Sequence, residues 1–80
     1  MTSDARTEGV LALLTRAGAL RQEGRLDSAE TLCRQALQYD ERSPDAWAML
    51  GALRMQRGDP REATRSLVAA LDLLQWQHAP

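Results

Sequence analysis

The sequence predicts an all-α protein of four helices, arranged as two antiparallel helix-turn-helix units in which the second unit repeats the first. Three observations support this prediction: apolar residues recur every three or four positions, Gly and Pro separate these stretches, and similar residues recur at a spacing of 34. With 80 residues the chain forms one small domain, with repeat one at about 10–43 and repeat two at about 44–77.

The first helix is predicted by an apolar stripe that ends before a glycine. The stripe consists of Val10, Leu13, Leu14, Ala17 and Leu20. This spacing places all of them on one face of a helix of about four turns. Gly24 follows the stripe, and glycine readily adopts the positive φ with which many helices end.

The second helix is predicted by another apolar stripe within a few residues. Its members are Leu32, Cys33, Ala36 and Leu37, with Tyr39 as a candidate last member. Asp27 and Glu30 have the spacing of a capping box, in which two side chains satisfy exposed backbone N–H groups. We therefore expect these two residues to start the helix.

The third and fourth helices each follow a polar residue and a proline. Ser43-Pro44 is typical of an N-cap and a first helical residue, and Asp59-Pro60 with Glu62 repeats that arrangement. The packed side of the third helix is predicted to contain Trp47, Leu50, Gly51 and Leu53. The stripe of the fourth helix contains Leu67, Ala70, Leu71 and Leu74.

The two halves are related by a constant spacing of 34 residues. The matching or similar pairs are Ala12/Ala46, Leu13/Trp47, Ala17/Gly51, Gly24/Gly58, Ala29/Ala63, Ala36/Ala70 and Leu37/Leu71. Several of these residues are small, and small residues let two helices approach closely where they cross. We therefore assign them to the architecture rather than to a functional site.

This pattern resembles two tandem tetratricopeptide repeats over nearly the whole chain. In the second copy it is carried by Trp47, Leu50, Gly51, Gly58, Asp59, Ala63, Leu67, Ala70 and Leu71. In the first copy it is carried by Leu13, Ala17, Leu20, Gly24, Ala29, Ala36, Leu37 and Asp40. The resemblance implies a short right-handed α-solenoid segment that binds proteins. Arg16 and Arg54 depart from the pattern, because Leu50 is the equivalent of Arg16 and the family usually has a large aromatic residue at the position of Arg54.

The resemblance also implies a concave groove lined by the first helix of each pair. Its residues here would be Leu11, Leu14, Gly18, Arg21, Asp45, Ala48, Met49, Ala52 and Met55. Family members that clamp a carboxyl-terminal peptide use Lys and Asn, and this chain contains neither residue. We therefore expect an apolar or helical segment of a protein or peptide partner. The alternative is that these residues pack against a neighbouring part of the same longer chain.

A second expected surface lies on the last helix. Stable stacks usually have three or more repeats and a polar covering helix, whereas this chain has two repeats and ends in LDLLQWQHAP. The self-association face is predicted to consist of Leu67, Leu71, Leu74 and Trp76. We expect a second copy, a following domain or a different protein to cover it, and we favour a homodimer.

Composition excludes several classes of partner and compartment. The net charge of −1 gives no general attraction to nucleic acid or to an anionic membrane, and no apolar run approaches the roughly 20 residues that span a bilayer. The amino terminus lacks a secretory pattern and Cys33 is the one cysteine, so we expect a cytoplasmic protein. All ten basic residues are arginine, which is typical of a GC-rich bacterial genome.

We expect no enzyme activity, no cofactor and no metal site in these residues. His78 is the one histidine, Cys33 lies on an apolar stripe, and no glycine-rich phosphate loop or Cys/His cluster occurs. The alternative is the amino-terminal adaptor of a larger bacterial enzyme, such as a transferase or hydroxylase, that continues past Pro80. Two interpretations of Arg54, Arg57, Arg61 and Arg65 stay open: solvated arginines with packed stems, or a basic cluster for an acidic partner.

Overall fold

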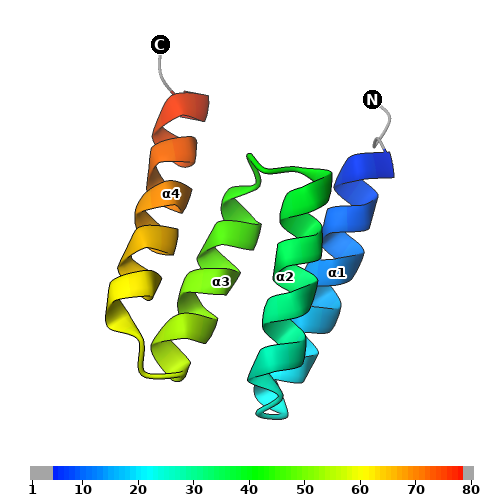
Figure 1. Cartoon of the computed structure of the whole chain (residues 1–80). Helices are drawn as coiled ribbons and strands as arrows, with labels where there is room; N and C mark the ends of the chain where they lie inside the picture. Colours follow the sequence, from blue (N-terminus) through cyan, green and yellow to red (C-terminus); the bar gives the residue numbers. More distant parts are fainter. Residues whose placement is uncertain (1–4, 79–80) are drawn as a thin grey trace.

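A computed structural model of the chain describes residues 5–78 as four α-helices (Figure 1). Helix α1 spans Ala5–Gln22, α2 spans Leu26–Tyr39, α3 spans Pro44–Gln56 and α4 spans Pro60–His78. The predicted all-α fold with two helix pairs is thus confirmed. Helix α1 begins at Ala5, more than one turn before Val10, the first residue of its apolar stripe. Residues 5–8 are helical, although they are exposed to solvent.

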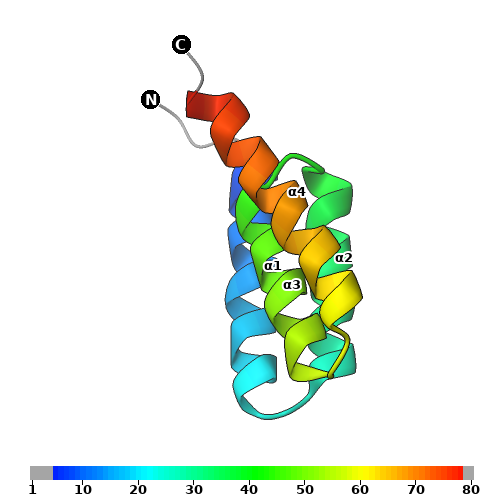
Figure 2. The same ribbon diagram turned by 90° about the vertical axis from the view of Figure 1, so that its left-hand side faces the viewer.

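Helix α3 occupies the centre of the arrangement. It packs against α1, α2 and α4, whereas α2 and α4 make no contact with each other within the described residues. Figure 2 shows α1 and α3 toward one side of the molecule and α2 toward the other, with α4 crossing over α3. One surface of the molecule is therefore formed by α1 and α3, and the other by α2 and α4 with α3 between them.

Most of the alanines that the 34-residue spacing selected are buried, whereas Ala12 is exposed. The buried members of the core are Val10, Leu14, Ala17, Ala29, Cys33, Ala36, Ala46, Leu50 and Leu53. Ala17, Ala29 and Ala36 are fully buried, as is Ala63 on α4. Because an alanine leaves only a methyl group between two backbones, these positions set the close approach of the helices.

The predicted helix boundaries hold at four places. Gly24 and Gly58 end α1 and α3 with φ of 80° and 83°, the left-handed conformation that glycine adopts without strain. Ser43 is the N-cap of α3, and its hydroxyl accepts the Ala46 N–H at 3.2 Å. Asp59 precedes α4 and accepts the Glu62 N–H through Oδ1 at 3.3 Å.

The predicted capping box at the start of α2 is wrong. The N-cap is Arg25, which makes no side-chain cap hydrogen bond, and the helix begins at Leu26. The 34-residue spacing relates Asp59 to Arg25 rather than to Asp27, so Asp27 lies inside the first turn. Glu30 instead contacts arginines of α2 and α3.

Helix α4 is longer than its counterpart in the first repeat. It has 19 residues where α2 has 14, and it remains helical at Leu74, whose counterpart Asp40 is already the C-cap of α2. The end of α4 therefore projects beyond the other helices (Figure 1).

Candidate functional site

The first candidate site is an open groove between α1 and α3, called here the α1/α3 groove. It has a volume of about 480 Å³ and is lined by Leu11, Leu14, Thr15, Arg21, Asp45, Ala48, Met49 and Ala52. The repeat explains this arrangement, since Leu11 and Asp45, and likewise Leu14 and Ala48, are equivalent residues on two packed helices.

Most of the residues expected in the groove line it, but Gly18 and Met55 are not among the lining residues. Gly18 lies below Met49, because a Cβ atom built on Gly18 would be 3.7 Å from Met49 Cε. Met55 is 57% exposed. Thr15 is a lining residue that the sequence analysis missed, although it follows Leu11 by one helical turn.

The α1/α3 groove is apolar in the middle and charged at its ends. Leu14 is buried at its floor, while Leu11 and Ala48 are exposed along it. Asp45 lies in the first turn of α3 and Arg21 in the last turn of α1, where each complements the dipole of its own helix. Arg21 Nε also donates a hydrogen bond to Gln56 Oε1 at 3.0 Å, which joins the two helices at one end of the groove.

The second candidate site is an uncovered apolar strip on α4, called here the α4 leucine face and defined as Leu67, Val68, Leu71 and Leu74. Their side chains are 39%, 48%, 59% and 41% exposed, respectively. The equivalents of Leu67 and Leu71 on α2 are Cys33, which is fully buried, and Leu37, which is half-buried. Val68 was missed by the sequence analysis, although it lies next to Leu67 and Leu71 on the helix surface.

Trp76 does not share this face. It follows Leu67 by nine residues, which is about two and a half helical turns, so the two side chains leave α4 on opposite sides. Trp76 is 68% exposed, and the guanidinium of Arg42 lies 5.3 Å from its ring centroid. The expected self-association face is therefore split into three leucines on one side and a tryptophan beside the α2–α3 loop on the other.

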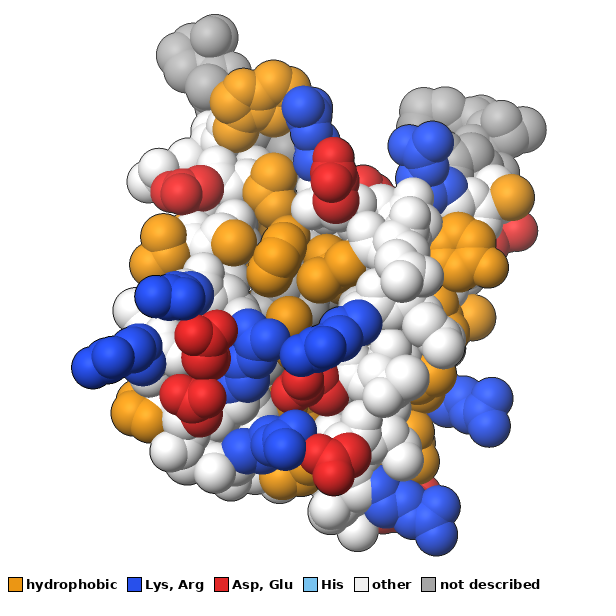
Figure 3. All heavy atoms as spheres, in the orientation of Figure 1, with side chains coloured by type: hydrophobic (Ala, Val, Ile, Leu, Met, Phe, Trp, Pro, Cys, Tyr) orange, Lys and Arg blue, Asp and Glu red, His pale blue; other side chains and the backbone are white. Residues whose placement is uncertain are grey.

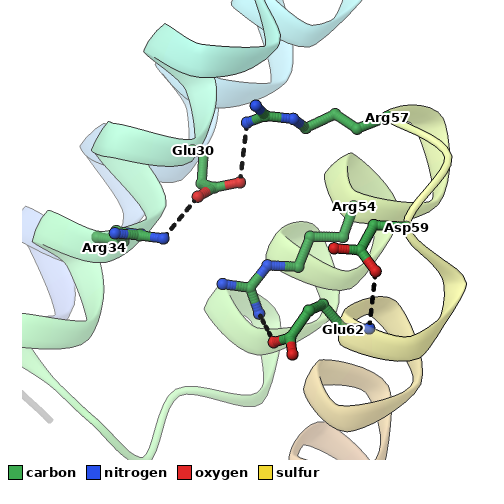
Figure 4. A pocket seen from close by; sticks show the side chains of 6 residues that line it. All are labelled: Glu30, Arg34, Arg54, Arg57, Asp59 and Glu62. Carbon is green, nitrogen blue, oxygen red and sulfur yellow. Dashed lines mark hydrogen bonds and ion pairs between the residues drawn. The ribbon is translucent and has the colours of Figure 1, made fainter.

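The third candidate site is a charged pocket of about 340 Å³ on the opposite surface from the α1/α3 groove. Figure 3 shows charged side chains gathered on the lower half of this surface and hydrophobic ones above them. The pocket is lined by Glu30, Arg34, Arg54, Arg57, Asp59 and Glu62, which Figure 4 shows from close by. The pocket therefore contains both arginines and carboxylates, which come from α2, α3, α4 and the loop between α3 and α4.

The ion pairs of this pocket join neighbouring helices. Glu30 of α2 lies 2.8 Å from Arg34 and 3.3 Å from Arg57 (Figure 4). Arg57 also lies 2.8 Å from Asp27. These contacts connect the first turns of α2 to the end of α3. Arg57 is the C-cap of α3, so its positive charge also complements the dipole of that helix.

A second group of contacts connects α3 to α4. Arg54 donates a hydrogen bond to Ser66 Oγ at 2.9 Å and lies 3.6 Å from Glu62. Arg65 lies 3.2 Å from the same carboxylate, while the side chain of Arg61 is exposed. Arg54, Arg57 and Arg65 are thus each paired with a carboxylate of the same chain, which supports the structural interpretation of these arginines. Ser66, a buried hydroxyl that receives Arg54, was not identified from the sequence.

Cys33 is a fully buried thiol in the core, as its place on an apolar stripe predicts. Burial, with a smaller contribution from the negative charge of Glu30, raises the pKa of the thiol from 9.0 to about 11. The thiolate is therefore disfavoured at neutral pH. Within residues 5–78 no three His, Cys, Asp or Glu side chains gather closely enough to hold a metal ion, and the side chain of His78 lies outside what the structure describes.

None of the helices between residues 5 and 78 combines the length and the hydropathy that a membrane-spanning segment requires.

Comparison with known proteins identifies the family. A family model described as tetratricopeptide repeat matches residues 20–75, which is well over half of the chain. Comparisons with curated proteins and with solved structures found no match. The match includes α2, α3 and most of α4, together with the end of α1. The chain therefore belongs to the tetratricopeptide repeat family, whose repeats are typically non-catalytic protein-interaction modules.

Proposed function

We propose that the protein is an interaction module that docks an apolar or helical segment of a protein or peptide partner in the α1/α3 groove. One observation carries the proposal. Helices α1 and α3, which occupy equivalent positions in the two repeats, place apolar side chains along a single open groove with a volume of about 480 Å³. A surface of this shape can accept a segment that continues past both ends of the groove, as a docked helix would.

The side chains of the groove suit a helical occupant. Ala48 and Ala52 leave room for a helix to approach, and the thioether of Met49 can adapt to different apolar shapes. Asp45 and Arg21 lie at opposite ends and can contact polar residues at the ends of the segment. Binding energy would therefore come from the burial of apolar side chains in the middle of the groove. The charged residues at its two ends would fix the position of the partner along it.

The test uses peptides selected on the immobilised protein from a display library of amphipathic helices. Selected peptides should carry an apolar stripe, and Ala48→Glu should abolish their binding because a docked apolar side chain would bury the new carboxylate. Met55→Glu, about one helical turn beyond the lining residue Ala52, should weaken binding. Circular dichroism of both variants should match the parent, since residues 48 and 55 are exposed in the free protein.

The matched control is Thr64→Glu, which places the same charge on an exposed position of α4. It should leave peptide binding unchanged. Binding that survives Ala48→Glu, or loss of helicity in that variant, would contradict the proposed groove.

A second proposed function is self-association through the α4 leucine face. It is supported by the exposure of Leu67, Leu71 and Leu74 and by the small net charge, which does little to keep two copies apart. Replacing Leu71 and Leu74 with Gln should shift the mass measured by light scattering toward the monomer and lower the melting temperature, because dimerisation and folding are linked. A parent that sediments as a monomer at tens of micromolar would contradict this second function.

The adaptor alternative assigns the same α4 leucine face to a catalytic domain of the same polypeptide, such as a transferase or hydroxylase. The native reading frame beyond Pro80 separates this alternative from a free-standing module. We place the module in the bacterial cytoplasm as part of the proposal, supported by the lone buried Cys33 and by the use of arginine for every basic residue.

A further inference from the structure

We propose that the segment docked in the α1/α3 groove is an amphipathic helix of about three turns, acidic in its first turn and basic in its last, that runs antiparallel to α1 and α3. This inference rests on the docking function proposed above and adds the length, the charges and the direction of the occupant. Its support comes from the charged residues at the two ends of the groove.

The two ends of the groove differ in charge, because α1 and α3 run in the same direction (Figure 1). Asp45 lies in the first turn of α3, and Arg21 lies in the last turn of α1. Glu8 is exposed in the first turn of α1 and precedes Leu11 by about one turn on the same side of the helix, so it adds a second negative charge near Asp45. One end of the groove is therefore acidic and the other is basic.

The fold does not use these charges to pair its own helices. Asp45 and Arg21 take part in none of the ion pairs among residues 5–78, whereas Arg54 and Arg57 in the charged pocket each contact a carboxylate. The hydrogen bond from Arg21 Nε to Gln56 Oε1 holds the guanidinium at the end of the groove. The terminal N–H groups of Arg21 are thus positioned to donate to a carboxylate of a docked segment.

The middle of the groove offers apolar contacts. Thr15 supplies the one hydroxyl among the lining residues, and this hydroxyl already donates to the Leu11 carbonyl oxygen at 2.8 Å. Leu14, Ala48 and the other apolar lining residues lie between the two charged ends. The matching part of the occupant is therefore an apolar stripe.

The distance between the charged ends sets the length of the occupant. Asp45 and Gln56, the contact of Arg21, are eleven residues apart on α3, which corresponds to about 16 Å along the helix. Eleven residues make close to three turns, so two charges eleven residues apart on a docked helix lie on the same face. Apolar residues about four and seven positions after the first charge share that face.

The direction follows from the charges that stabilise a helix. Acidic residues in the first turn and basic residues in the last complement the dipole of the helix that carries them. When such a helix docks antiparallel to α1 and α3, its acidic turn contacts Arg21 and its basic turn contacts Asp45 and Glu8. In the opposite direction it would bring like charges together at both ends of the groove.

The direction can be measured with a synthetic peptide that has Glu near its amino terminus, Leu about four and seven residues later and Lys about eleven residues later. A nitroxide attached to the amino terminus of the peptide should broaden the amide NMR signals of Gln22 and Gln56 more than those of Leu11 and Asp45. A nitroxide attached to the carboxyl terminus should give the reverse. The opposite pattern would overturn the antiparallel direction.

Charge reversal tests the contacts at the two ends. Arg21→Glu and Asp45→Lys should each weaken binding of the dye-labelled peptide about fivefold, measured by fluorescence anisotropy. The neutral variants Arg21→Gln and Asp45→Asn should weaken it about twofold, which gives a second measurement with less effect on the helix ends. Arg61→Glu and Asp72→Lys make the same charge changes at exposed positions outside the groove and should have no effect.

The double variant Arg21→Glu/Asp45→Lys exchanges the charges of the two lining residues at the ends of the groove. The same peptide should then dock in the reverse direction, so the effect of the amino-terminal nitroxide should move from Gln56 to Leu11. An unchanged direction in this variant would overturn the role of the charges.

The outcomes separate this charge order from the proposed docking function. Library peptides that lose binding in Ala48→Glu but bind Arg21→Glu and Asp45→Lys as tightly as the parent would overturn the charge order and leave the groove in place. A parent that binds library peptides but not the synthetic peptide would overturn the proposed length and charges. A parent that binds neither would overturn the docking function itself.

Discussion

Gly51 of α3 lies directly under Leu67 of α4, so that a Cβ atom at residue 51 would be 2.8 Å from Leu67 Cγ and 3.3 Å from the Ala63 carbonyl oxygen. No ordinary side-chain contact is that short. The glycine thus allows α4 to approach α3 closely while Leu67 extends toward solvent and the α4 leucine face. The close approach of α4 to α3 at Gly51 therefore links the packing of the second repeat to the exposed α4 leucine face, to which Leu67 belongs.

Gly51→Ala should lower the free energy of unfolding by about 1 kcal/mol. Alanine favours a helix over glycine by about 1 kcal/mol, but overpacking against Leu67 costs about 1–3 kcal/mol. In a Leu67→Ala background the collision is removed, and Gly51→Ala should then raise stability by roughly 0.5–1 kcal/mol. Urea unfolding of the four proteins of this cycle measures both values, and an equal effect in the two backgrounds would contradict the contact.

Ala63→Leu and Ala29→Leu should each lower stability by about 1–3 kcal/mol, because both alanines are fully buried where paired helices cross. Ala19→Leu is the matched control, since Ala19 lies in the second half of α1 and is exposed. It should change stability by no more than about 0.5 kcal/mol. Equal melting temperatures for Ala63→Leu and the parent would mean that the two repeats are aligned incorrectly.

The helices could be predicted because their signals are local. Apolar stripes, positive-φ glycines and Ser43 or Asp59 before a proline each act within a few residues, and all of these predictions are confirmed. The start of α1 could not be predicted, since residues 5–8 are helical but exposed and carry no apolar periodicity. The start of α2 was misplaced because spacing alone made Asp27 resemble a cap, although the repeat assigns that place to Arg25.

Arg25→Asp should stabilise the protein by about 0.5–1 kcal/mol. Its counterpart Asp59 accepts the Glu62 N–H before α4, whereas Arg25 offers no acceptor to the exposed N–H groups of α2. Asp59→Ala should correspondingly lower stability by about 1 kcal/mol. Thermal unfolding followed by circular dichroism measures both changes, and a loss of stability in Arg25→Asp would show that α2 does not need a cap.

The candidate surfaces could be predicted in part. Most of the residues that the resemblance to tetratricopeptide repeats assigns to the groove line the open surface between α1 and α3, because equivalent positions on these helices follow from the spacing. The separation of Trp76 from the leucines was missed because the prediction grouped exposed apolar residues without their rotation around the helix. The contact of Arg42 with Trp76 depends on a loop whose path the sequence does not specify.

Cys33 should react slowly with a thiol reagent in the folded protein at pH 8 and at the full rate in urea. The thiol is buried against the core, and the thiolate is the reactive species. An Ala19→Cys variant in a Cys33→Ala background supplies an exposed thiol as the control and should react quickly without denaturant. Rapid labelling of Cys33 under native conditions would mean that the core opens on the timescale of the reaction.

The same burial should make stability depend on pH in a defined window. The pKa of Cys33 is about 11 in the folded protein against an ordinary value of 9.0, so between these values the unfolded chain binds fewer protons than the folded one. The free energy of unfolding should therefore fall as the pH rises from 9 to 11, and this group should contribute no pH dependence below that window. Urea unfolding at pH 8, 9, 10 and 11 measures the slope. The Cys33→Ala variant should lose this part of it, and an unchanged slope in that variant would assign the dependence to other groups.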